Sequence, residues 1–156
     1  MSKKRKCLLV IDSVALAFTL GFIWINSCLS QSTSASESGG IYLTVKPMLD
    51  AIFGKDVITH IIFRKFAHFS EFFALGMEIC VLYCLIYGVN KDKVVQIISA
   101  GLFVAVIDES IQILSNRGPA VIDVLIDYSG YLTACAISFA VIWLIERRSK
   151  KKGSLQ

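Results

Sequence analysis

The chain has 156 residues, of which 55% are hydrophobic and 18% charged, and its formal net charge is +4. The apolar share exceeds the roughly 45–50% of soluble domains, and this length predicts one domain, residues 1–156. Basic residues gather at the two ends, outside the long apolar runs. That placement is typical of membrane anchoring, and it leaves no soluble basic module that would bind nucleic acid.

The first apolar run, residues 8–26, is about as long as the ~20 residues that a bilayer span needs. A cleaved signal peptide is the alternative, because basic residues precede the run and small residues follow it. We expect the run to be retained, since it is long for a signal sequence and Trp24 suits a membrane interface.

An exterior loop over residues 27–58 is expected next. Its serine-rich first part is too polar to fold alone, which predicts a flexible linker, with a lid over the bundle as the alternative. The spacing of apolar residues over 41–53 predicts a short interfacial helix that starts near Pro47.

The second span, residues 61–87, begins with a polar helix face. His60, Arg64, His68 and Glu71 follow one another at steps of four, four and three, so they share one side of a helix. Lys65 lies off this face, where its long side chain is expected to reach the membrane surface. Further along the same span, Glu78 is either a proton-relay step or half of a pair whose partner the sequence does not identify.

The third and fourth spans, residues 94–114 and 121–145, carry polar groups on both sides of the turn that joins them. Asp108, Glu109 and Gln112 precede the turn, Arg117 lies in it, and Asp123 and Asp127 follow it. Gly130 continues the face of the last two carboxylates and favours the close approach of another helix.

Four spans place both chain ends on one side of the membrane, and the positive-inside rule predicts that this side is the cytoplasm. The sequence thus predicts an all-α polytopic membrane protein with four transmembrane helices and cytoplasmic N- and C-termini. Short turns make the last three spans antiparallel neighbours, so their polar ends should meet in one outer layer. The groups expected in that layer are Arg64, Lys65, His68, Glu71, Asp108, Glu109, Gln112, Arg117, Asp123 and Asp127.

Ionisable groups within a membrane are costly, about 3 kcal/mol or more at the bilayer centre, so they usually face a bundle interior or a water-filled cavity. In this layer the carboxylates outnumber the fixed cations, which predicts a protonated carboxylate, a charged histidine or a bound cation. A sealed ion-pair network and a polar pocket open to the outside are the two alternatives. The charge imbalance favours the pocket.

Two segments resemble the motifs of a known family. Residues 64–72, RKFAHFSEF, look like the RKxxHFxEY motif of the VanZ-like family, which is named after the teicoplanin-resistance protein, and residues 108–112, DESIQ, look like its DExxQ motif. Arg117, Asp123 and Gly130 match the rest of the second motif. Phe72 stands where the family usually has tyrosine, and Asp127 where it usually has asparagine. The second departure adds a negative charge.

The resemblance implies a multi-pass protein of the bacterial cytoplasmic membrane that acts in the cell envelope, and it suggests a link to teicoplanin resistance. We expect the outer pocket to bind or modify a lipid headgroup or a lipid-linked cell-wall precursor. A membrane enzyme that uses His68 and the carboxylates for proton transfer is the alternative. A small transporter fits less well, because the polar residues concentrate at one side. The expected surroundings are the lipid bilayer, with no nucleic acid, no cofactor and no metal.

Overall fold

The computed structural model describes residues 2–88, 90–115 and 120–153, and within them it contains helices and no strands. The elements are α1 (Lys3–Cys28), α2 (Gln31–Phe53), α3 (His60–Tyr87), the short 3-10 helix η1 (Lys91–Lys93), α4 (Val94–Leu114) and α5 (Val121–Gly153). By length and composition, α1, α3, α4 and residues 121–145 of α5 are suited to cross a membrane. The predicted all-α architecture with four spans is therefore confirmed.

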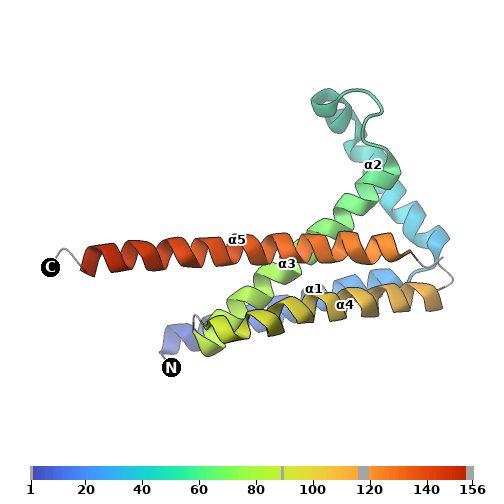
Figure 1. Ribbon diagram of the computed structural model, residues 1–156. Helices are drawn as coiled ribbons and strands as arrows, with labels where there is room; N and C mark the ends of the chain where they lie inside the picture. Colours follow the sequence, from blue (N-terminus) through green and yellow to red (C-terminus); the bar gives the residue numbers. More distant parts are fainter. Residues whose placement is uncertain (1, 89, 116–119, 154–156) are drawn as a thin grey trace.

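The start of α1 and the end of α5 lie at the same end of the bundle (Figure 1). The Arg5 Nε donates a hydrogen bond of 2.7 Å to the Leu85 carbonyl, which ties the beginning of α1 to the end of α3 at that level. In the same view α3 crosses the other spans diagonally, and α2 projects beside its first turns (Figure 1). The placement of the two ends is the one expected for four spans. That they face the cytoplasm stays a prediction.

The bundle is held together by a close crossing of α3 and α5, the pair with the most extensive contact. Small residues make the crossing possible: a Cβ on Gly76 would lie 2.8 Å from the Tyr131 carbonyl oxygen, and one on Gly130 would collide with the backbone of Phe69. The sequence predicted that another helix approaches closely at Gly130, and that helix is α3. Membrane helices associate through such backbone-to-backbone packing, because lipid supplies no hydrophobic drive between them.

Apolar side chains divide into a small core and a large outward-facing set. Phe72, Leu75 and Tyr131 are fully buried between the helices. In contrast, Phe18 is 75% exposed and Leu114 is 84% exposed, as are many large apolar residues on the four spans. This distribution would be unfavourable in water and is the expected one for helices surrounded by lipid.

The serine-rich segment is helical, so the prediction of a flexible linker was wrong for residues 31–40, whereas a helix within residues 41–53 was expected. Helix α2 begins after Ser30, whose Oγ accepts a hydrogen bond from the Thr33 amide. It contains Pro47 in its interior, whereas a helix starting near that residue was expected. The segment does not fold alone: Ser38 Oγ lies 3.0 Å from His60 Nε2, and the Tyr42 ring contacts the rings of His60 and Phe63 on α3. Because α2 docks on α3, the segment agrees better with the alternative of a lid over the bundle than with a flexible linker.

A charged cluster closes the connection from α2 to α3 and predicts a pH effect. Asp50 accepts hydrogen bonds from the Asp56 amide and from Lys46 Nζ, each at 3.0 Å. These contacts, the amide first, lower the pKa of the Asp50 carboxyl. The cluster is therefore fully formed above the usual carboxylate range and is lost only as the pH falls through the lowered pKa.

We expect Lys46→Met to raise the pKa of Asp50 part of the way toward its ordinary value, because the Asp56 amide still favours the charged form. Carboxyl carbon NMR of the labelled protein across an acid titration measures this change. Lys55→Met is the control, since Lys55 acts on Asp50 only at longer range and should shift it less. A titration of Asp50 that is the same in both variants would contradict the expectation.

Candidate functional site

Asp108 of α4 lies at the centre of a buried polar cluster and is 0% exposed. Gln112, one turn further along α4, donates from Nε2 to Asp108 Oδ2 at 2.8 Å. Ser27, near the end of α1, donates a short hydrogen bond to Asp108 Oδ1 and also contacts the Ile23 carbonyl. The carboxylate is thus held in one orientation by donors from two helices.

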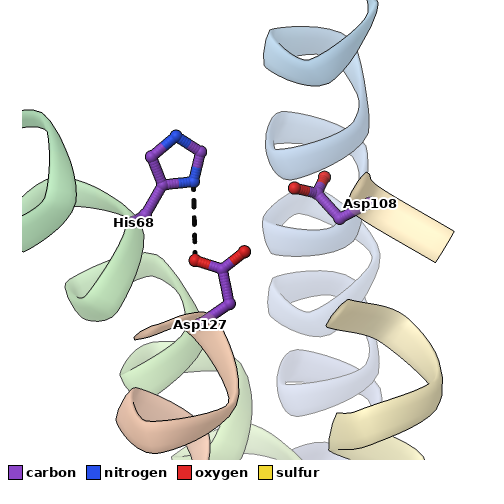
Figure 2. A group of neighbouring side chains, drawn as sticks. All are labelled: His68, Asp108 and Asp127. Carbon is purple, nitrogen blue, oxygen red and sulfur yellow. Dashed lines mark ion pairs between the residues drawn. The ribbon is translucent and has the colours of Figure 1, made fainter. Parts of the chain in front are cut away.

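His68 of α3 and Asp127 of α5 face each other next to Asp108 (Figure 2). The imidazole Nδ1 lies 3.6 Å from Asp127 Oδ1, which is an ion-pair distance when the histidine is protonated. Asp127 is 1% exposed, and neither of its oxygens has a hydrogen-bond donor among the residues that the structure describes. One nitrogen or oxygen from each of His68, Asp108 and Asp127 lies within 4.8 Å of the others.

Three of the predicted polar residues, Lys65, Asp123 and Glu109, have partners outside the cluster around Asp108. Lys65 Nζ lies 2.6 Å from Asp123 Oδ1, a partner that the sequence had not assigned to this lysine. Both side chains are more than a third exposed, and such a pair contributes little stability. Glu109 of α4 accepts the Ala120 amide at 2.7 Å and so fixes the approach to α5.

Arg64 and His68 each line two pockets. The smaller one, about 70 Å³, lies between α3, α4 and α5 and is bordered by Lys65, Gln112, Asp123 and Asp127 in addition to these two. The larger one, about 400 Å³, lies between α1, α2 and α3. The residues that line it are Phe22, Asn26, Leu29, Ser34, Glu37, Ser38, Ile41, Phe63, Arg64, Ala67, His68 and Glu71.

Arg64 and Glu71 are the half-buried charges of the larger pocket. Within the described ranges neither side chain makes a hydrogen bond or an ion pair. They share α3 with His68 and sit at steps of four and three residues from it, as the spacing predicted. The pocket therefore offers a guanidinium and a carboxyl group that make no hydrogen bond or ion pair with the rest of the described protein.

The structure thus places nine of the ten predicted polar residues at the end of the bundle where α3 and α5 begin and α4 ends. They lie in the cluster around Asp108, in the contacts of Lys65 with Asp123 and of Glu109 with Ala120, and on the pocket walls. The tenth, Arg117, lies outside the described residues. Glu78 lies apart from them, on the part of α3 that approaches the chain ends, and accepts a hydrogen bond of 2.9 Å from Thr19 of α1. Its partner, which the sequence left open, is therefore a neutral hydroxyl.

Sequence reasoning missed Ser27. It treated the first span as an anchor, whereas the structure uses its end to hold Asp108. The available signal was weak: Ser27 lies one turn after Ile23, on the buried side of α1, near the end of a mostly apolar stretch.

Four apolar helices around a buried set of carboxylates and one histidine define a polytopic membrane protein with a polar cluster near one end. The chain belongs to the VanZ/LLP1 family, whose model matches residues 8–143. Its four spans and its family fit a multi-pass protein of the bacterial membrane. No curated protein and no solved structure matches the chain.

Proposed function

We propose that the pocket between α1, α2 and α3 binds the phosphate-bearing headgroup of an envelope lipid or of a lipid-linked cell-wall precursor. The observation that carries this proposal is Arg64, a half-buried guanidinium with no partner among the described residues, on the wall of a 400 Å³ pocket. A guanidinium matches the geometry of a phosphate and can bind it through two parallel hydrogen bonds.

The remaining walls suit an amphiphile. Phe22, Ile41 and Phe63 supply apolar surface next to side chains that face the surrounding lipid. Asn26, Ser34 and Ser38 supply hydrogen-bonding groups on the same pocket. A site of this volume accommodates a headgroup, and the acyl or prenyl chains can remain in the bilayer.

Glu71 adds a requirement on the ligand. A carboxylate beside a phosphate site would repel a ligand that carries only negative charge, unless the ligand also presents a donor to it. An ethanolamine amine and the hydroxyls of a phosphate-linked sugar both meet this requirement. Glu71 therefore favours a headgroup that has a phosphate and a donor close together.

The test is native mass spectrometry of the full chain in detergent, with phosphatidylethanolamine or a polyprenyl-phosphate sugar added at known concentration. Arg64→Gln is expected to weaken binding about 10- to 100-fold, because charge-assisted hydrogen bonds contribute about 1.5–3 kcal/mol. Arg148→Gln is the matched control, since Arg148 is exposed near the other end of α5. Equal binding by both variants would contradict the proposal.

The two lipid arms distinguish the sources of the headgroup. Preference for the sugar-bearing lipid would place the protein on a cell-wall precursor, and a shift in teicoplanin susceptibility on expression is then expected to depend on Arg64. Preference for phosphatidylethanolamine would favour a role with bulk membrane lipid and no such shift.

A second candidate function, an enzyme on the same lipids, is favoured by the pairing of His68 with the buried Asp127. A carboxylate that orients an imidazole is a common arrangement for general acid–base chemistry. His68→Ala separates the candidates: an enzyme loses turnover of the added lipid while its affinity is kept. A simple binding site shows no conversion of the lipid in either protein.

A further inference from the structure

We propose that His68, Asp108 and Asp127 bind one divalent transition-metal cation, Mn²⁺ or Zn²⁺. The three residues come from α3, α4 and α5, and one possible ligand atom of each lies within 4.8 Å of the other two (Figure 2). Ligand atoms around a single ion at about 2.1 Å are separated by about 3–4 Å. The three ligand atoms are therefore slightly further apart than a bound ion requires, and an ion would draw them together.

Asp127 points to a ligand independently of this clustering. Its carboxylate is 1% exposed, and its oxygens accept no hydrogen bond from the described residues. Figure 2 shows the group turned toward His68 and on the side of Asp108. A buried carboxylate that is left without donors is costly, and a bound cation removes that cost for Asp127 and reduces its repulsion with Asp108.

Two neighbouring residues hold the Asp108 carboxylate in an orientation suited to binding a metal ion. Ser27 and Gln112 hold Asp108 from two sides, which is how groups around a metal fix the orientation of its ligands. Lys65, which borders the same small pocket as Asp127, forms its ion pair with Asp123.

The donor set selects the kind of ion. Two carboxylates alone suit Mg²⁺ or Ca²⁺, whereas an imidazole nitrogen favours transition metals such as Zn²⁺ and is compatible with Mn²⁺. Because His68 also lines both pockets, the ion would be reached from them and would keep a coordination position open toward them. This inference departs from the sequence-based expectation of no metal.

The test uses the full, untagged chain in detergent, stripped with EDTA and loaded separately with Mn²⁺, Zn²⁺ and Mg²⁺. Metal content after desalting and calorimetric titration should show one equivalent of Mn²⁺ or Zn²⁺, bound more tightly than Mg²⁺. Asp127→Asn is expected to weaken binding at least about 100-fold. The matched control, Asp123→Asn, alters a carboxylate one turn away and should keep the full equivalent.

His68→Gln is a second variant in case the first does not fold, and its affinity should fall in the same way. Added Mn²⁺ or Zn²⁺ should also raise the melting temperature of the wild type and of Asp123→Asn, and leave Asp127→Asn unchanged. A wild-type chain that retains no metal, a preference for Mg²⁺, or equal binding by the Asp127 and Asp123 variants would overturn the proposal.

Discussion

Replacing Gly130 by alanine is expected to destabilise the bundle by about 3 kcal/mol or more, the upper part of the range for overpacking. The new methyl group would collide with the Phe69 carbonyl of α3, and a backbone group cannot move aside as a side chain can. Helices α3 and α5 would have to separate, and with them the residues that each brings to the polar cluster. Thermal unfolding in detergent micelles measures the change.

Gly21→Ala is the control for this substitution. Gly21 also lies within a membrane-spanning helix, but apart from the adjoining backbone of its own helix no heavy atom lies within 4 Å of where its Cβ would be. Alanine there should leave the stability unchanged or raise it by up to about 1 kcal/mol, through helix propensity alone. If both alanine variants melt at the same temperature, the close crossing of α3 and α5 at Gly130 is not present in the protein.

A loss of about 3–5 kcal/mol is expected for Tyr131→Ala, because the side chain is fully buried and its removal leaves a cavity between α3, α4 and α5. The ring lies against Gly101 of α4, and its hydroxyl donates a hydrogen bond of 2.6 Å to the Ile97 carbonyl. Tyr131 follows Asp127 by one turn, so it helps to hold the carboxylate-bearing start of α5 in place.

Tyr131→Phe separates packing from hydrogen bonding. It keeps the ring and removes only the hydroxyl, so about 1 kcal/mol of stability should be lost. The same melting experiment reports both variants. A phenylalanine variant that is as unstable as the alanine variant would show that the hydroxyl, and not the ring, holds α5 to α4.

The spans could be predicted closely because they depend on length and apolar content, which are properties of the sequence itself. The predicted bounds 61–87, 94–114 and 121–145 differ little from α3, α4 and the apolar part of α5. Helix α2 could not be predicted in the same way. Its serines have low helix propensity, and its contacts with α3 through Ser38 and Tyr42 are not contained in any local pattern.

For the polar residues, the helix face could be predicted from the sequence, but the contact partners could not. Helical spacing was enough to place Arg64, His68 and Glu71 on one face of α3, since the period of the helix fixes it. The partners of these charges could not be predicted: the crossing of α3 and α5 brings Lys65 to Asp123, a pair that helical spacing does not indicate. Crossing geometry depends on where small residues such as Gly130 let backbones meet, and that decides which charges become neighbours.

The shared polar cluster is tested most directly by solid-state NMR of the protein in lipid bilayers, through dipolar couplings between imidazole nitrogens and aspartate carboxyl carbons. The chain has only two histidines, and His60→Gln leaves His68 as the sole imidazole signal. We expect a measurable coupling to a carboxyl carbon, because His68 Nδ1 lies 3.6 Å from Asp127 Oδ1, and its loss or marked weakening in Asp127→Asn. A His68 ring with no aspartate carboxyl carbon within about 6 Å, beyond the reach of an ion pair, would contradict the cluster.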